Sequence, residues 1–376
     1  MKRLVSVIIF ILFTTMFFAN IKNPDKPLKG EWDFKLKRVW IIKSAGGEEF
    51  ANPRQLLVSG DGTIYVYDDK RLKFYILDPD GKNINTFGKK GEGPGEIQQM
   101  EQTQLFLVKN KLIAIDGARL HYFTREGKYI NSVVNTGPQR PTFFINENEY
   151  ISSPIFINLN APDSEGKIKH YNIKTKQEKV ISEFSLFNKG YVETPAGRRT
   201  IVVVGITPMM VNGYDGSKIY FGKNDSFEIN VVDLKGKKYN SFGIKREKEK
   251  YPEEPLRQRF NELASKPSKE MVDSIIKSLP REYTFFNRIE VYNDLIYVFI
   301  PDLDDKNPRK LDIFSAEGKY LYRGYLSFGK NMSALLSPLH TLIIKNGYLY
   351  IALENEEGEI FIAKYKINLP KKNRRG

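Results

Sequence analysis

Ionisable residues recur at one position of a repeated pattern along the chain. Asp68 and Arg71 stand three residues apart directly after one apolar run, and Asp116 and Arg119 repeat this spacing after another. A carboxylate and a guanidinium placed so across a loop can form a hydrogen-bonded ion pair. The recurrence favours a role in fixing the loop, with ligand recognition as the alternative.

Further polar residues follow apolar runs in the same way, and we expect all of them in loops that share one face. Loops held on a rigid scaffold are where binding residues concentrate. The candidate ligand-binding residues are Asp68, Arg71, Asp116, Arg119, Asn224, Asp302, Arg309 and Glu354.

Carboxylates and amides of this kind could bind Ca²⁺ if several of their oxygens converged. The sequence assigns none of them to a shared centre. Asp302–Asn307 matches the start of an EF-hand loop only loosely, because it lacks glycine at the sixth position and glutamate at the twelfth. We therefore predict no cofactor, and keep Ca²⁺ as the one candidate ion.

The motifs of the common nucleophilic enzymes are missing from the sequence. There is no cysteine, which excludes disulfides, thiolate metal sites and cysteine nucleophiles. There is no Gly-x-Ser-x-Gly segment. The three histidines, His121, His170 and His340, fall in separate expected strands, the first two away from the axis of the fold, and do not make a zinc site. The catalytic residues, if there are any, stay unassigned.

The element that must position these residues is a repeated unit of strands, seen most clearly between Val58 and Lys82. Asp61-Gly62 is a hairpin turn signal, because glycine adopts positive φ without a steric penalty. The residues Ile64–Tyr67 are β-branched or aromatic, as half-buried strands prefer. A further apolar run and an Asp-Gly-Lys turn complete the unit.

The unit recurs six times, with a basic period of about 40–50 residues, which is typical of a propeller blade of four strands. Its first strands are expected at Leu56–Val58, Leu105–Val108, Phe143–Ile145, Met209–Val211, Arg288–Val291 and Leu342–Ile344. The sixth copy lacks the Gly-Lys turn and the fourth strand. We expect the N-terminal strand Phe34–Ile42 to supply it, because ring closure hides sheet edges.

The predicted fold is therefore an all-β, six-bladed β-propeller over residues 34–369, closed by an N-terminal strand. A short helical insertion is expected at 245–284, between blades four and five, where apolar residues recur with helical spacing. Ser268 suits its second helix as an N-cap, and Pro280 would end that helix. The insertion could serve as a lid or partner-binding element, or simply pack against the side of the propeller. A basic tail, 370–376, follows the last strand.

Residues 1–20 predict export. Lys2-Arg3 precede an apolar run of about 16 residues, which is the pattern of a secretory signal and short for a membrane span. Phe17 is too large for the −3 position of a cleavage site after Ala19, so an uncleaved N-terminal anchor is the alternative. We expect a periplasmic or extracellular protein of a bacterium, either released or, if the segment stays uncleaved, anchored in the inner membrane.

The formal net charge is +14, and six of the positive charges lie in the first three and last six residues. A basic surface can attract nucleic acid, anionic lipid or acidic glycans, although solubility alone can account for it. Along the sequence the basic residues do not form one stripe, and export argues against RNA. We therefore expect no nucleic-acid partner, and membrane contact only through the N-terminal segment.

The segment Phe87-Gly-Lys-Lys-Gly-Glu-Gly-Pro-Gly-Glu-Ile97, together with the Asp-Gly-x-Ile-Tyr-Val strand and the Gly-Lys turns, resembles the six-bladed β-propeller proteins related to NHL repeats. Exported bacterial members of this group commonly carry Gly-x-Gly-Pro-Gly-Glu-Phe between blades one and two; here Ile97 replaces the phenylalanine. Thr175 replaces the turn glycine of blade three. The resemblance covers about residues 34–367 and implies the fold but no particular activity. The glycine-rich run matches neither phosphate-binding motif, and we interpret it as a crossing between blades.

These observations favour a binding or scaffold module that recognises a protein, peptide or glycan through its loop face. The alternative is a Ca²⁺-dependent lactonase-like hydrolase or a lyase with a metal in the central channel, which would resemble other six-bladed propellers. The sequence does not give the oligomeric state.

Overall fold

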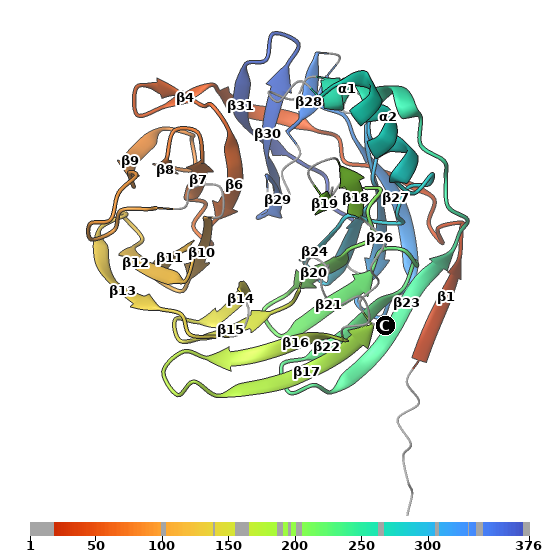
Figure 1. The fold of residues 1–376 in the computed structure, drawn as a ribbon, viewed down its shortest axis with the longest axis horizontal. Helices are drawn as coiled ribbons and strands as arrows, with labels where there is room; N and C mark the ends of the chain where they lie inside the picture. Colours follow the sequence, from red (N-terminus) through yellow and green to blue (C-terminus); the bar gives the residue numbers. More distant parts are fainter. Residues whose placement is uncertain are drawn as a thin grey trace, which may run out of the picture.

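The computed structural model describes residues 19–98, 103–137, 140–154, 165–185, 191–194, 197–200, 205–261, 267–304, 308–329, 331–335 and 341–370. The described residues form six sheets of at least four strands, which stand around a common axis (Figure 1). Each of these sheets is one blade of a six-bladed β-propeller. Within a blade the four successive strands pair antiparallel. The first strand of each blade lies nearest the axis (Figure 1).

The first three blades follow the predicted strand order. Blade one contains β6 (Pro53–Val58), β7 (Ile64–Asp68), β8 (Lys73–Leu77) and β9 (Asn83–Phe87). Blade two contains β10 (Gln104–Val108), β11 (Lys111–Asp116), β12 (Arg119–Thr124) and β13 (Tyr129–Val134). Blade three contains β14 (Pro141–Asn146), β15 (Glu149–Ser152), β16 (Glu165–Asn172) and β17 (Glu178–Ser185).

The last three blades all take up strands from the N-terminal segment. Blade four contains β20 (Met210–Tyr214), β21 (Lys218–Lys223), β22 (Ile229–Asp233) and β23 (Lys238–Lys245), with β1 (Ala19–Pro24) parallel to β23. Blade five contains β24 (Arg288–Tyr292), β25 (Leu295–Phe299), β26 (Arg309–Ser315) and β27 (Tyr320–Leu326), with β2 (Glu31–Asp33) parallel to β27. Blade six contains β29 (Leu342–Lys345), β30 (Tyr348–Asn355), β31 (Ile360–Lys366) and β3 (Lys37–Ile42), and β28 (Met332–Ala334) also pairs with β30.

Strand β3 pairs antiparallel with β31 and is the outer strand of blade six. Strands β1 and β2 were not predicted from the sequence. They lie N-terminal to residue 34 and add an outer strand to blades four and five. Residues 1–18 lie outside the described part of the chain, so the predicted signal or anchor stays a prediction, and so does the basic tail beyond residue 370. Among the described residues, no helix is long and apolar enough to cross a membrane.

The turns between third and fourth strands show why glycine recurs in the repeat. Gly81, Gly127, Gly236 and Gly318 all have φ between 85° and 88°, a region that only glycine enters without strain. In blade three, where Thr175 stands in place of the glycine, Lys176 adopts the positive φ of 57° instead. The turn is therefore kept at a conformational cost to a lysine.

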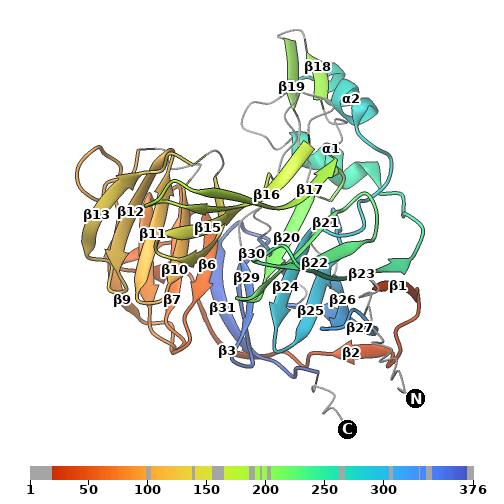
Figure 2. The same cartoon turned by 90° about the horizontal axis from the view of Figure 1, so that it is seen from below.

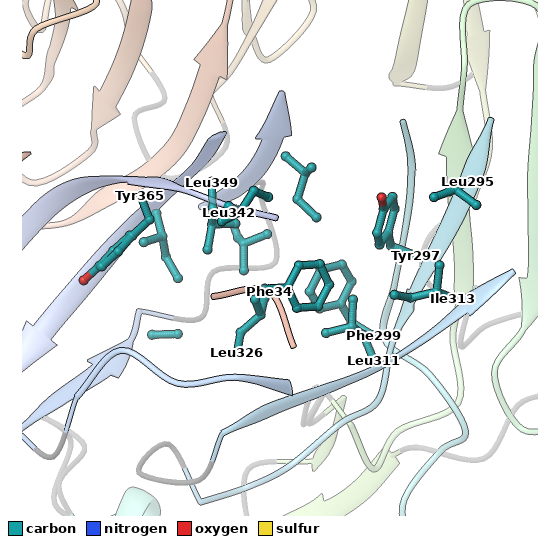
Figure 3. Close-up of a cluster of buried hydrophobic side chains, with 14 of the residues drawn as sticks. Phe34, Leu295, Tyr297, Phe299, Leu311, Ile313, Leu326, Leu342, Leu349 and Tyr365 are labelled. Atoms are coloured by element: carbon teal, nitrogen blue, oxygen red, sulfur yellow. The ribbon is translucent and has the colours of Figure 1, made fainter. Parts of the chain in front are cut away.

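Aromatic and aliphatic side chains fill the spaces between neighbouring blades. The largest cluster joins blades five and six and includes Phe34, Tyr297, Leu311, Leu349 and Tyr365, all buried (Figure 3). Phe34 comes from the N-terminal segment between β2 and β3, so this segment is part of the core. Polar contacts add to the packing: the Gln55 amide donates to the Leu105 carbonyl (2.7 Å) and accepts from the Leu105 N–H (2.8 Å), joining the inner strands of blades one and two.

The smaller elements gather mainly on one face. The connections between blades three and four and between blades four and five carry the hairpin β18 (Tyr191–Thr194) and β19 (Gly197–Thr200), and the helices α1 (Glu253–Asn261) and α2 (Lys269–Ser278). The hairpin and helices stand together at one end of the ring (Figure 2). We call this end the loop face. Elsewhere, β4 (Ser44–Ala45) and β5 (Glu48–Glu49) form a short hairpin before blade one.

Candidate binding face

The helix pair on the loop face is a packed structure rather than a solvated insertion. Ser268 caps α2, since its side chain accepts a hydrogen bond from the Met271 N–H (3.3 Å). Apolar side chains from both helices pack with residues of the neighbouring connections. This buried cluster comprises Ile206, Tyr251, Leu256, Phe260, Val272, Ile275, Ile276, Leu279 and Leu303. The helices are therefore fixed over blades four and five, and form one wall of the loop face.

The structure gives the predicted carboxylate Asp68 a structural role. It is fully buried, and its side chain accepts hydrogen bonds from the backbone N–H groups of Ala51 (2.7 Å), Asn52 (3.0 Å) and Arg71 (3.1 Å). The Arg71 guanidinium instead donates to the Glu49 carbonyl (3.0 Å). The two side chains therefore do not form the expected ion pair. The carboxylate instead satisfies backbone N–H groups of the loop and so fixes its shape.

Asp116 and Asn224 repeat this arrangement in blades two and four. Asp116 accepts from the Gln98 N–H (2.7 Å), just before the inner strand of its blade. Asn224 accepts from the Met209 N–H (2.8 Å) and donates to the Phe286 carbonyl (2.8 Å). Both residues are buried. A polar residue at the end of the second strand therefore latches the connection that enters the blade, which explains the recurrence in the sequence.

The remaining predicted residues are spread over three blades. Arg119 is exposed. Its backbone lies opposite that of Asp116 where β11 pairs with β12. The Asp302 carboxylate accepts from the Asp304 N–H (2.9 Å), and Arg309, which is buried, donates to the Asp302 carbonyl (3.4 Å). Glu354 lies in β30 and is partly exposed. Of the predicted site residues in blades one and two, Arg71 and Arg119 are exposed, whereas Asp68 and Asp116 are buried.

The described residues contain no group of three or more His, Asp or Glu side chains that could hold a metal ion. Asp305 and Asn307 of the EF-hand-like segment, and also His340, lie outside the described residues. The structure thus offers no support for a calcium-dependent centre in the part of the chain that it describes.

His121 is a buried histidine in β12 of blade two, and its ring has few polar contacts. It is 3% exposed, neither ring nitrogen has a hydrogen-bond partner, and Nε2 lies 3.7 Å from an Asp116 carboxylate oxygen, too far for a hydrogen bond. Burial lowers the pKa of His121 below its ordinary value of 6.5. The imidazole therefore takes up a proton at lower pH in the folded protein than in the unfolded chain.

This burial predicts a loss of stability on mild acidification. Below about pH 6.5 this histidine is protonated more fully in the unfolded chain than in the folded protein. Its contribution should therefore lower the free energy of unfolding by up to about 1.4 kcal/mol per pH unit. Urea unfolding midpoints at pH 7.5, 6.5 and 5.5 measure the slope. His121→Leu should flatten it. An unchanged slope in His121→Leu would contradict the assignment.

Arginines that the sequence analysis did not single out stand where the inner strands begin on the loop face. Arg54 lies in β6, Arg140 directly precedes β14, and Arg288 opens β24. Arg54 pairs with Asp69 (3.0 Å), and Arg288 pairs with Glu290 (2.6 Å). A basic residue at or beside the first residue of an inner strand, in three of the six copies, was the signal that could have identified them.

Arg140 differs from the other two arginines. The residue is exposed, and its guanidinium forms no hydrogen bond or ion pair with any described residue. Burial of part of the side chain and the nearby positive charge of Arg54 lower the pKa of Arg140 from its ordinary value. A guanidinium in this state gains from an anionic partner, because a carboxylate or phosphate can accept two parallel hydrogen bonds from it.

Comparison with known proteins supports the fold. The family model DUF5128, described as a 6-bladed beta-propeller, matches residues 48–134. A protein from Bacteroides fragilis NCTC 9343 that is named "putative exported protein" has a similar structure. Its TM-score is 0.52, with 12% sequence identity over 93% of this chain and 99% of that one. A member of the DUF4221 family from Bacteroides vulgatus ATCC 8482 has a TM-score of 0.55 and 10% identity over 89% and 99% of the two chains. No curated protein matches the chain significantly in sequence. The suspected resemblance to six-bladed propellers, including exported bacterial ones, is confirmed.

Proposed function

For a six-bladed β-propeller with these features, we propose that the chain is an exported binding module that recognises an anionic group of a protein, peptide or glycan through its loop face. The observation that carries the proposal is Arg140, a guanidinium without a partner among the described residues, at the start of an inner strand and near Arg54. The packed helices α1 and α2 stand on the same loop face, in the connection between blades four and five. The rigid blades keep the charged groups in place, which lowers the entropic cost of binding.

Export is proposed on two grounds. The sequence begins with a basic pair and an apolar run of the signal type. The structurally similar protein from Bacteroides fragilis bears the name "putative exported protein". An exported propeller would meet envelope proteins and acidic glycans, which fits the kind of ligand proposed.

Substitution of Arg140 tests the proposal. Purified protein is titrated with arrays of acidic and neutral peptides and glycans. We expect acidic members to bind, and Arg140→Ala to weaken them about 10–100-fold, since hydrogen bonds to charged groups contribute about 1.5–3 kcal/mol. Lys109→Ala, in the turn between β10 and β11, removes an equal charge from the opposite face and should leave affinity unchanged. Equal binding of neutral ligands, or affinity that does not depend on Arg140, would contradict the proposal.

A further inference from the structure

A second charged surface lies along the outer edges of blades three, four and five, away from the loop face. It consists of three short segments: the turn and strand at 174–180 of blade three, the turn and strand at 233–239 of blade four, and the N-terminal segment 22–29. We call this surface the basic rim. Its exposed lysines are Lys22, Lys26, Lys29, Lys174, Lys176, Lys179, Lys235, Lys237 and Lys238.

Direct contacts make the three segments one surface. The Lys179 ammonium donates to the Lys235 carbonyl (3.0 Å), which joins blade three to blade four. Strand β1, which leads to Lys22, pairs with β23 from Ala19↔Asn240 onward. Figure 1 shows β17, β23 and β1 following one another along the outer edge of the ring.

The rim is strongly positive. Against its nine lysines the three segments contain only Asp25, Glu178 and Asp233. Two of these carboxylates already face other cations: Asp25 pairs with Arg246 (2.6 Å) and Arg323 (2.7 Å), and Glu178 pairs with Lys169 (2.7 Å). Lys22 also lies 3.7 Å from Glu228, outside the three segments, and nine lysines against three carboxylates still give the rim a large excess of positive charge.

Apolar and aromatic side chains are exposed among these lysines. Leu28 is 65% exposed, and Val180 and Tyr239 are each 40% exposed. The ammonium groups of Lys218 and Lys237 lie 4.4 Å and 5.3 Å from the centre of the Tyr239 ring. Lysine mixed with exposed aliphatic and tyrosine side chains is the composition that favours the boundary between lipid headgroups and acyl chains.

The chain itself leads from this rim toward an apolar segment. The apolar run that begins at Leu4 ends at Ala19, where β1 starts. No linker separates this run from the rim, because β1 is hydrogen-bonded along its length to β23. An apolar segment in a bilayer would therefore bring the lysines of the rim to the bilayer surface.

We propose that the basic rim binds the surface of an anionic lipid bilayer. Juxtamembrane lysines are attracted to anionic headgroups within a Debye length of the surface, and the exposed Leu28, Val180 and Tyr239 add apolar contact. An RNA or acidic protein would use the lysines but would give no role to the neighbouring apolar run. With the rim on the bilayer, the loop face and Arg140 remain open to a ligand.

Vesicle binding of the full-length chain tests this inference. Co-sedimentation is measured with vesicles of phosphatidylglycerol and phosphatidylcholine, and with phosphatidylcholine alone; the N-terminal apolar run contributes to both, so the ratio of the two partition coefficients reports the rim. We expect the anionic vesicles to be preferred. The triple variant Lys235→Gln, Lys237→Gln, Lys238→Gln should lower that ratio about 100-fold, at about one kilocalorie per mole for each lysine.

A matched triple variant, Lys82→Gln, Lys109→Gln, Lys128→Gln, removes the same charge from exposed turns of blades one and two that lie away from the loop face, and should keep the ratio. An equal loss in both triple variants, or a wild-type protein without preference for anionic vesicles, would overturn the inference. Binding of single-stranded RNA in place of the anionic vesicles would also overturn it. Since Arg140 lies outside the rim, ligand binding by the loop face should be the same in both triple variants, which separates this test from that of the proposed function.

Discussion

Replacing Asp312 with alanine is expected to lower the free energy of unfolding by about 3–5 kcal/mol, the range for removing one partner of a buried ion pair. Asp312 is fully buried in β26. Its carboxylate pairs with Arg246 (2.8 Å) and Arg323 (3.3 Å), and it accepts a hydrogen bond from the Tyr320 hydroxyl (2.5 Å). Without it, the Arg246 side chain, which is only 8% exposed, would lose its buried counter-charge.

Two matched variants separate charge from shape at this site. Asp312→Asn keeps the volume and one hydrogen-bond acceptor, so we expect a smaller loss than in Asp312→Ala. Asp25→Ala removes the other carboxylate that both arginines share, but its side chain is 40% exposed, so about 1 kcal/mol or less is expected. Urea denaturation followed by tyrosine fluorescence measures all three. Equal losses in Asp312→Ala and Asp25→Ala would show that the buried carboxylate has no special role.

The strands of the propeller were predictable because their signals are local. Each blade shows apolar runs separated by turns, and the Gly-Lys turns mark the start of the fourth strands, where Gly81 and its counterparts adopt positive φ. Strands β1 and β2 gave no such signal. Their short polar sequences become strands only because the outer edges of blades four and five offer free backbone groups, which is a tertiary effect that no local pattern reports.

The binding face was less predictable for a related reason. Asp68, Asp116 and Asn224 were selected by residue type, but an oxygen that satisfies backbone N–H groups has the same type as one that binds a ligand. The difference depends on burial and on the partners, which come from the connection entering each blade. Arg140 had the opposite problem. The start of an inner strand is a position that it shares with Arg54 and Arg288, and only the structure shows that no described residue pairs with it.

Replacing Phe34 with alanine is the second change expected to have a large effect, about 3–5 kcal/mol of unfolding free energy. Phe34 is 1% exposed, and its ring packs among buried residues of blades five and six (Figure 3). A methyl group on Gly324 would lie 2.6 Å from this ring, so the ring fills the space that the glycine leaves open, and the substitution would leave a cavity there.

The position of Phe34 gives this prediction a second, kinetic part. The segment that carries it is bound on both sides, by β2 against β27 and by β3 against β31, and the Asn368 N–H donates to the Phe34 carbonyl (2.7 Å). Because these contacts join the two ends of the chain, a destabilised segment should detach before the blades unfold. Hydrogen exchange should therefore show faster exchange in β2 and β3 of Phe34→Ala than in β7 or β11. Val39→Ala, at a side chain that is 48% exposed in β3, provides the control and should change neither stability nor exchange. Uniform acceleration across all blades would instead mean that the N-terminal segment unfolds together with the whole ring.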